Sequence, residues 1–585
     1  MAPLPAVQLK ILLVSVLLTL TSAVPAGFPL AVQKPLCKVI PGTLNWPSAE
    51  SWNRLNEPTG GRLLRPPPPG AVCHPGQPTY DAAECPAVLA GWSTFEFHQA
   101  DPISTDWNQW NNDSCLPQQA DPYSGQGYPV FVINTTTPEH IKLGVNFASE
   151  HNIRLVVKSS GHDYLGRSVA PNSLYIWVHR LKGLETHSSF RPQSCNVDIE
   201  ASAVTAGAGS QMFELYSALD ALNQTTVGGN RRTVSLGGYL TGGGHSILAP
   251  RYSLAADQVL EMELVTPTGD IVTANQCQNQ DLFWAMRGIR LAFGGCSTFG
   301  ILISATIKTF PSPQIVATPY IFDVVAYVLA QYPSLSDRGV SGYSFFFQAL
   351  PTLFDGGATT VGGIYMQMNL QDSTVEAMAQ LWEPIFEHIN STWPGFHAGF
   401  TSKNYTPFNN WFLDYLEVAE AGVDRLVGSR LLGADVLTAN LTLNAEVFKR
   451  FATSGVGAAY LMSGKGVQNT QPRGGGNAAL PAWGWAYVHA VLGQMFEPLN
   501  ATARAEAFEL VNYALDPMRE LAPDSGAYMN EADPQEPDWQ HQFWGSHYDR
   551  LVYIKRAIDP EDVLWCNPCV GNERWKEVGD QLYQA

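Results

Sequence analysis

A run of glycines between residues 237 and 244 constrains the fold of this chain more than any other feature. The sequence GGYLTGGG places five glycines in eight residues, and His245 follows directly. Glycine loses more backbone entropy on folding than any other residue, so this density predicts that the backbone closely approaches a flat or charged ligand rather than packing. The run has neither the G-x-G-x-x-G spacing of a classical dinucleotide fold nor the lysine of a P-loop.

A second loop with small residues, KSSGHDYLGRS at 158–168, directly follows a predicted buried strand at 154–158. Small residues allow backbone N–H groups to surround an anion such as a phosphate. His162 lies inside this loop, where it could meet a cofactor. An ordinary turn that happens to contain a histidine is the alternative interpretation of the loop alone.

Composition narrows the class of protein. The chain has 585 residues, 45% of them hydrophobic and 15% charged, which favours two or three folded domains and excludes a disordered or coiled-coil chain. With 34 Lys and Arg against 52 Asp and Glu, the formal net charge is −18. Because nucleic-acid binding needs clustered cations, no nucleic-acid partner is expected.

The N-terminus and the sequons indicate the secretory pathway. An apolar run at 11–20 precedes small residues at 21–23, which predicts a signal peptide over 1–23; a membrane anchor is the alternative. No later stretch is long and apolar enough to span a membrane. Seven N-x-S/T sequons predict a glycoprotein that is extracellular or in the cell wall or vacuole. They are Asn112, Asn134, Asn223, Asn390, Asn404, Asn440 and Asn500.

The nine cysteines fit an oxidising compartment, and their odd number leaves at least one thiol unpaired within the chain. The pair Cys566 and Cys569 has the spacing of a redox or zinc motif. Since no second CxxC occurs, structural disulfides are favoured and no metal site is predicted.

Changes in composition and in helix and strand patterns divide the mature chain into four segments. Residues 24–124 are rich in Cys and Pro and are expected to be stapled rather than packed. Strands and glycine-rich turns alternate over 125–312, with one helical pattern at 137–151. Longer helices and strand candidates fill 313–520, and 521–585 is aromatic and polar with few helix-length patterns.

Two further motifs complete the pattern: DLFWAMRG at 281–288 with GGCSTFGI at 294–301, and a tail with YMNEAD at 528–533 and FWGSHYDRL at 543–551. The four motifs in this order resemble the secreted fungal FAD-linked oxidoreductases of the vanillyl-alcohol-oxidase superfamily, which have a PCMH-type FAD domain. The chain is similar to berberine-bridge-enzyme-like proteins, and most similar to those labelled isoamyl alcohol oxidases.

The resemblance implies an α+β fold. A two-part PCMH-type FAD-binding domain would comprise 125–312 and the returning segment 521–585, and an α/β substrate domain with an antiparallel sheet would occupy 313–520. It also implies that His162 bonds covalently to the 8α-methyl carbon of FAD. The other implied cofactor-binding residues are Ser159, Ser160, Gly161, Asp163, Gly166, Thr233, Gly237, Gly238, Gly242, Gly243, Gly244, His245, Ile303, Asn530 and Tyr548.

Two departures from the family pattern bear on the cofactor. Members whose flavin has two covalent bonds carry a cysteine ahead of the glycine run, where this chain has Arg231, so a single bond is expected. Five residues, 289–293, also interrupt the family's Arg-Gly-Gly-Gly motif, as a local bulge or as an artefact of the gene model.

The implied function is oxidation of an alcohol or a secondary-metabolite intermediate, with hydride transfer to FAD and dioxygen as the re-oxidant. A carbohydrate oxidase and a catalytically inactive secreted glycoprotein are the alternatives. Tyr343, Tyr365, Tyr487 and His489 are candidates for the catalytic base by their strand-like context. Burial as ordinary core residues is favoured for each, so no base is assigned.

Overall fold

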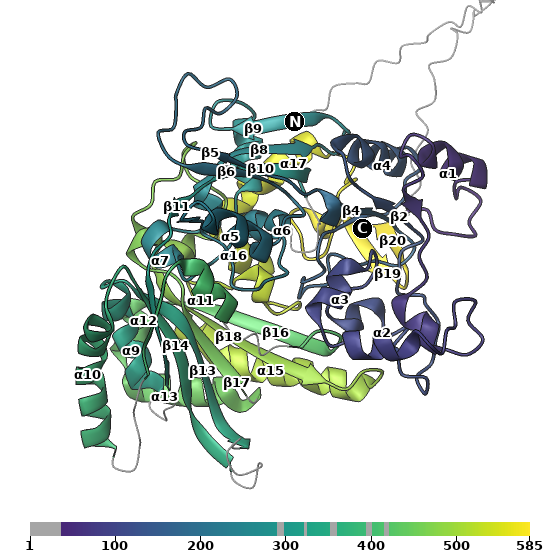
Figure 1. Cartoon of the computed structure of the whole chain (residues 1–585). Helices are drawn as coiled ribbons and strands as arrows, with labels where there is room; N and C mark the ends of the chain where they lie inside the picture. Colours follow the sequence, from purple (N-terminus) through teal and green to yellow (C-terminus); the bar gives the residue numbers. More distant parts are fainter. Residues whose placement is uncertain are drawn as a thin grey trace, which may run out of the picture. The chain divides into compact units, whose positions relative to one another are not determined.

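A computed structural model describes residues 37–288, 298–320, 325–351, 360–393, 401–414, 420–454 and 456–585 (Figure 1). The predicted signal peptide, the five residues 289–293 and Cys296 lie outside these ranges. Within them, no helix has the length and apolar character needed to cross a membrane.

Two sheets and their helices form the part of the chain that carries both glycine-rich loops. The first sheet has the order β1-β2-β4-β3, and β4 pairs in parallel with both β2 and β3. Its strands are β1 (Leu63–Leu64), β2 (Phe131–Asn134), β3 (Leu155–Lys158) and β4 (Leu174–Trp177). Helix α4 (Pro138–Glu150) connects β2 to β3, so the predicted helix at 137–151 and strand at 154–158 are confirmed.

The second sheet is antiparallel with the order β5-β6-β10-β8-β9. Its strands are β5 (Leu184–His187), β6 (Ala203–Gly207), β8 (Val259–Val265), β9 (Ile271–Asn275) and β10 (Ile301–Lys308). The associated helices are α5 (Met212–Asp220), α6 (Leu236–Thr241), α7 (Ala249–Tyr252) and α8 (Gln280–Met286). Strands β7 (Gln224–Thr225) and β11 (Phe310–Pro311) form a separate pair.

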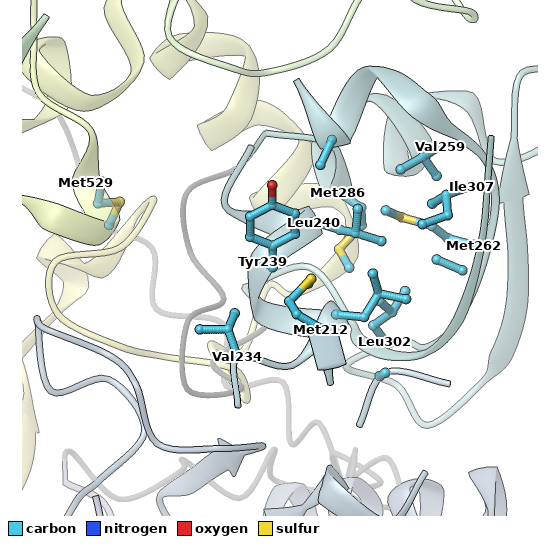
Figure 2. Close-up of a cluster of buried hydrophobic side chains, with 14 of the residues drawn as sticks. Met212, Val234, Tyr239, Leu240, Val259, Met262, Met286, Leu302, Ile307 and Met529 are labelled. Atoms are coloured by element: carbon cyan, nitrogen blue, oxygen red, sulfur yellow. The ribbon is translucent and has the colours of Figure 1, made fainter. Parts of the chain in front are cut away.

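A buried core fixes the first half of the glycine run to this second sheet. Met262 from β8 and Leu302 from β10 share the core with Met212 of α5, Leu240 of α6 and Met286 of α8, as Figure 2 shows. Each of these five side chains is at most 3% exposed. Burial of this size anchors α6, and the glycines that follow α6 therefore start from a fixed point.

A seven-stranded antiparallel sheet dominates the middle of the chain, in the order β15-β12-β14-β13-β17-β18-β16. Its strands are β12 (Ile315–Tyr320), β13 (Val340–Pro351), β14 (Thr360–Gln371), β15 (Lys403–Tyr405), β16 (Asp424–Gly433), β17 (Val456–Leu461) and β18 (Ala486–Phe496). The helices of this region are α9 (Val325–Ser336), α10 (Val375–Thr392), α11 (Phe408–Asp414), α12 (Ala434–Ala439), α13 (Leu441–Phe451), α14 (Lys465–Gln468) and α15 (Ala501–Leu521).

The helices α9, α10, α13 and α15 share one hydrophobic core with side chains of this sheet, among them Phe346, Met366 and Leu426. Because side chains alternate along a strand, Tyr343 of β13 and His489 of β18 fall outside that helix-covered core. The predicted α+β fold with an antiparallel sheet in its second part is confirmed; the segment boundaries stay predictions.

The N-terminal segment is packed, contrary to expectation. It contains α1 (Ala49–Asn56), α2 (Cys85–Gly91) and α3 (Phe95–Ala100), and one disulfide, Cys73–Cys85. Trp52 and Trp107 are 5% and 0% exposed. The Cys73–Cys85 disulfide does hold this segment, but the prediction that it is not packed was wrong because it gave too little weight to the large area that each tryptophan buries.

The tail also contains more helix than expected, namely α16 (Trp539–Trp544), α17 (Tyr548–Ile558) and a hairpin of β19 (Trp575–Val578) with β20 (Gln581–Gln584). It contacts the first part of the chain: Leu564 bridges to Leu155 of β3, and the Lys555 ammonium donates to the Thr298 carbonyl at 2.9 Å.

The disulfides Cys195–Cys277 and Cys566–Cys569 complete the pairs among the described residues, so the predicted disulfide at the CxxC pair is present, and its structural rather than redox role stays a prediction. Among the same residues Cys37 and Cys115 are unpaired thiols. Burial raises the pKa of Cys115 to about 12, which makes this thiol unreactive at neutral pH.

Candidate active site

The His162 imidazole is held by three side chains from two segments that are distant in the sequence. Its Nε2 lies 2.7 Å from the Thr233 hydroxyl, and its Nδ1 lies 3.0 Å from an oxygen of Asp106. Phe95 stacks on the ring with centroids 4.9 Å apart. Strand β3 delivers the loop, and the ring, 6% exposed, has a fixed orientation. The sequence predicted His162 and Thr233 but not Asp106 or Phe95, which belong to the N-terminal segment.

The surroundings of His162 keep its ring neutral. Burial, followed by the positive charges of Arg231 and Lys158, lowers the pKa of His162 to about 3. The Arg231 guanidinium lies 5.5 Å from the centre of the Phe95 ring. Phe95 is also the residue that stacks on His162. A neutral imidazole retains a nucleophilic nitrogen lone pair, so His162 has the electronic state that a covalent linkage requires.

The remaining residues of the His162 loop are buried except Tyr164 and Gly166, which are partly exposed. Ser160 is 5% exposed, and Gly161 has φ +106°, a left-handed conformation that favours glycine. The Asp163 carboxylate forms a buried ion pair with Arg167, whose guanidinium also lies 3.5 Å from the Asn530 carbonyl oxygen. Asp163 therefore shapes the loop through Arg167.

The glycine run serves two purposes in the structure. A Cβ on Gly242 would lie 2.1 Å from the Asn530 amide nitrogen, and one on Gly237 would lie 3.1 Å from the Ala208 carbonyl oxygen. These glycines allow close packing, as does Gly244, so the expectation that none of the run serves packing was wrong. Gly243 differs, because it has φ +96° and no heavy atom lies within 4 Å of its Cβ position.

Three observations fit an FAD cofactor in this region. The Ser159 hydroxyl and the His245 Nδ1 are buried and have no hydrogen-bond partner among the described residues. A buried polar atom needs a partner, and a nucleotide carries the hydroxyls and phosphate oxygens that could provide one. Gly243 adds a backbone position where a ligand can approach without meeting a side chain.

A cavity of about 450 Å³ adjoins the same loop. Gly166, Arg167 and Ala170 line one side, and Asn567 of the tail lines another. This volume is within the range of small-molecule sites. Gly166, with φ +75°, could not carry a Cβ, which would lie 2.4 Å from the Trp110 ring.

Two predicted cofactor residues lie in other surroundings. Ile303 is buried in the core of β10, where its carbonyl accepts a hydrogen bond from the Ala208 amide at 2.8 Å. The Tyr548 hydroxyl binds the Glu573 carboxylate and lies 3.4 Å from the Gly571 amide. The Ile303 side chain packs in a hydrophobic core and the Tyr548 hydroxyl binds within the tail, and their predicted cofactor contacts stay predictions.

A second histidine cluster lies where the glycine run, the seven-stranded sheet and the tail meet. His245 Nε2 lies 3.4 Å from one oxygen of Glu531, and His489 Nδ1 lies 3.5 Å from the other. Glu531 ends a short 3₁₀ turn (Met529–Glu531) directly after Asn530. Burial raises the pKa of Glu531, but the charges of His245, His489 and Arg231 outweigh burial and lower it, so the carboxylate is ionised.

The four candidates for the catalytic base differ in whether they lie at this histidine cluster. The Tyr487 hydroxyl binds Asp337 at 3.1 Å, away from the cluster, and Tyr365 is 39% exposed. Tyr343 and His489 instead lie in one cross-strand row with Tyr460 of β17 between them. Sequence reasoning missed Tyr460 and Glu531; the only available signal was their place in strand-like or tail motifs.

Comparison with known proteins agrees with this geometry. Residues 129–275 match the family model of the FAD binding domain, and residues 527–571 match that of berberine and berberine-like proteins. An uncharacterized FAD-linked oxidoreductase of Arthroderma benhamiae is 33% identical over 94% of this chain and 96% of its own. The FAD-linked oxidoreductase patO of Aspergillus clavatus is 31% identical over 95% of this chain and 94% of its own.

Among solved structures, the VAO-type flavoprotein MtVAO713 of Myceliophthora thermophila superposes with a TM-score of 0.86 at 27% identity, covering 94% of this chain and 100% of its own. A glucooligosaccharide oxidase of Acremonium strictum, at 16% identity and TM-score 0.60, shares the fold. The isoamyl alcohol oxidase subgroup stays a prediction. The chain belongs to the berberine-bridge-enzyme-like FAD-linked oxidoreductases of the vanillyl-alcohol-oxidase superfamily, and FAD is its cofactor.

Proposed function

We propose that this oxidoreductase holds its FAD through one covalent bond, at His162, and oxidises an alcohol. The neutral, buried imidazole of His162 is the observation that carries the first half of the proposal. One ring nitrogen would form the bond, and the other would keep its oxygen partner, Asp106 or Thr233. Ser159, Gly161, Gly243 and His245 would hold the remainder of the cofactor through backbone and side-chain contacts.

Arg231 supports a single bond. It occupies the position at which doubly linked relatives have a cysteine, and its charge reaches the His162 pocket. A guanidinium stays protonated and cannot act as the nucleophile that a second bond requires. The glucooligosaccharide oxidase of Acremonium strictum, by contrast, has an FAD with both a cysteinyl and a histidyl link.

The face of the seven-stranded sheet toward the His162 loop favours a weakly polar alcohol. Val427, Ala458 and Val491 form a small buried cluster there, and Tyr164, two residues after His162, packs against it with Phe345. A sugar needs many hydrogen-bonding groups to replace its water, whereas this cluster offers aliphatic and aromatic carbon beside the polar row of Tyr343, Tyr460 and His489. A small alcohol or a secondary-metabolite intermediate with an apolar body fits it better.

Oxidised FAD, when bound, supplies the acceptor for a hydride from the carbinol carbon. The chain must orient the alcohol, exclude water and take up the hydroxyl proton. The apolar cluster around Val427 excludes water, and Tyr164 and Phe345 provide flat surfaces against which an alcohol can be oriented. We propose dioxygen as the re-oxidant, which yields hydrogen peroxide.

Peroxide release across a defined panel tests this function. The alcohol arm contains benzyl alcohol, cinnamyl alcohol and 1-butanol, and the sugar arm contains glucose, cellobiose and xylobiose. We expect peroxide with at least one alcohol and at most weak signals with the sugars. Peroxide from the sugars alone would make the protein a carbohydrate oxidase, and anaerobic flavin bleaching without peroxide in air would make it a dehydrogenase. A colourless protein would indicate an inactive glycoprotein.

Secretion with N-glycosylation is part of the proposal. Asn112, Asn223, Asn390, Asn404 and Asn440 are exposed, as glycan acceptors must be, and a buried Asn134 carbonyl oxygen makes that sequon the poorest acceptor. N-terminal sequencing should begin near residue 24, and glycosidase treatment should lower the apparent mass. An intact Met1 and an unchanged mass would contradict secretion.

A further inference from the structure

The cluster of His245, His489 and Glu531 brings together three segments that are far apart in the sequence. His245 ends the glycine run, His489 lies on β18 and Glu531 belongs to the tail. One carboxylate faces both imidazoles, at 3.4 and 3.5 Å, and the two ring centroids are 5.5 Å apart. His489 is 0% and His245 8% exposed, so the pair of imidazoles is enclosed.

Aromatic rings enclose this cluster and fix its orientation. Tyr528 approaches both imidazoles edge-on, at 5.1 Å from His245 and 5.3 Å from His489. Tyr460 lies beside His489 in the neighbouring strand, with ring centroids 5.7 Å apart. Burying two imidazoles beside a partly buried carboxylate is costly and is compensated here by their mutual attraction, a pattern that is concentrated at functional sites.

The two imidazoles face different neighbours. His245 follows Gly243 and Gly244, and its buried Nδ1 has no partner among the described residues, which suits a cofactor contact. His489 projects from the sheet in the row with Tyr343 and Tyr460, opposite the helix-covered core. The substrate side of the cluster is therefore His489, and Glu531 connects it to the cofactor side.

The cluster is electrostatically connected to the His162 pocket. The charge of Arg231 lowers the pKa of both His162 and Glu531. The charges of Glu531 and Asp106 both raise the pKa of Tyr164. An ionised Glu531 stabilises an adjacent imidazolium, and a carboxylate facing Nδ1 leaves Nε2 as the proton acceptor. This is the arrangement that general-base catalysis uses.

We infer that His489 accepts the hydroxyl proton of the alcohol and that Glu531 is its positioning residue, shared with His245. The inference rests on the proposed alcohol oxidation. As the O–H bond breaks, its proton goes to Nε2 of His489 and its electron pair forms the C=O bond. The C–H bond of the carbinol carbon breaks as well, and its electron pair leaves with the hydrogen as a hydride that oxidised FAD accepts.

The test uses the FAD-loaded, full-length protein and three variants: His489→Gln, Glu531→Gln and the control Tyr487→Phe. Tyr487 lies on the same strand but its hydroxyl binds Asp337. Anaerobic flavin bleaching is measured with whichever of benzyl alcohol, cinnamyl alcohol and 1-butanol reacts fastest. Sulfite, which adds to oxidised flavin without a base, reports whether the flavin pocket is intact.

We expect His489→Gln to slow bleaching by the alcohol at least ~100-fold, the usual scale for a general base, while sulfite addition and Tyr487→Phe stay near unaltered rates. Glu531→Gln should slow bleaching ~10- to 100-fold and shift the acidic limb of the pH profile downward. Loss of a nearby negative charge lowers the pKa of an imidazole, so His489 would stay unprotonated at lower pH but be a weaker base. The other groups facing it are His245, Tyr343, Tyr460 and Tyr528, with Arg231 at longer range.

Several results would overturn the inference. If His489→Gln bleaches with alcohol within threefold of the unaltered rate, His489 is not the base. If His489→Gln loses sulfite addition to the same extent as bleaching, the effect of the substitution is structural and the inference also fails. An unmoved pH profile in Glu531→Gln would remove the positioning role, and a stoichiometric metal ion lost in both variants would mean that the cluster binds a cation instead. If no alcohol bleaches the unaltered protein, the proposed function itself fails.

Discussion

The two histidine environments near the glycine loops are built in opposite ways. Burial, followed by the positive charges of Arg231 and Lys158, lowers the pKa of His162 to about 3, and its ring nitrogens face one hydroxyl and one carboxylate. His245 and His489 share one ionised carboxylate, Glu531. Burial and nearby cations keep His162 neutral although the Asp106 carboxylate faces one of its nitrogens, whereas two imidazoles share one carboxylate in the second environment.

This difference suits His162 to a permanent covalent bond and the second cluster to reversible proton transfer. An imidazole that never protonates at physiological pH keeps its lone pair for a covalent bond. The imidazoles of His245 and His489 share a carboxylate that can stabilise a proton taken up during the reaction. The positive charge of Arg231 lowers the pKa of both His162 and Glu531, so this residue influences both environments.

The largest effect is expected from His162→Ala. This variant should lose all acid-stable flavin, because the only proposed attachment is gone, while FAD still binds noncovalently through the remaining contacts. Flavin fluorescence of the acid-precipitated protein measures this directly, and His489→Gln is the matched control that should keep its flavin. Acid-stable flavin in His162→Ala would place the bond elsewhere and end the contrast between the two histidines.

A smaller effect is expected from Gly242→Ala. The new Cβ would collide with the Asn530 amide, which donates to the Tyr528 hydroxyl at 2.7 Å, and so would displace the turn that carries Glu531. Overpacking of this kind costs about 1–3 kcal/mol in the free energy of unfolding. Acid-stable flavin at His162 should persist while alcohol-driven bleaching slows.

Gly484→Ala is the control for this substitution, because no heavy atom lies within 4 Å of its Cβ position and its φ is not in the left-handed region. It should leave the melting temperature unchanged. Equal melting temperatures for the two variants, measured by calorimetry, would show that Gly242 does not support the second environment.

The smallest effect concerns a carboxyl that contrasts with Glu531. Asp424, 1% exposed, has no imidazole beside it; burial and the neighbouring Asp113 raise its pKa to about 8. Its folded-state pKa exceeds the unfolded value, so the folded state binds the extra proton and loses stability as pH rises from about 4 to 8.

Asp424→Asn removes this titration, so its melting temperature should rise relative to that of the unaltered protein between pH 5 and pH 8, by about 1 °C for each ~1 kcal/mol in a chain of this length. Differential scanning calorimetry at both pH values measures the change. The exposed Asp435→Asn should show no such trend. A difference that stays constant with pH would mean that Asp424 is ionised like Glu531.

Local signals in the sequence predicted the parts of this site that follow one another along the chain. The helix at 137–151, the strand at 154–158 and the small residues before His162 are adjacent, and each has its own pattern. Arg231 was identified as the residue that replaces the cysteine of a second flavin bond, and its guanidinium lies 5.5 Å from the centre of the Phe95 ring, which stacks on His162.

The remaining contacts depend on segments that meet only in the folded chain. Asp106 reaches His162 from the N-terminal segment, and Glu531 reaches His489 from the tail. Neither residue has a periodic or capping signal that would mark it. The packing of Trp107, fully buried in a segment rich in proline and cysteine, was missed for the same reason.

The most direct test of the central claim is the mass of the flavopeptide from the unaltered protein. Tryptic digestion followed by mass spectrometry should give one yellow peptide that contains His162, carries one FAD and includes no cysteine link. Free FAD released on denaturation, or a peptide pair joined to the flavin through two residues, would contradict the account.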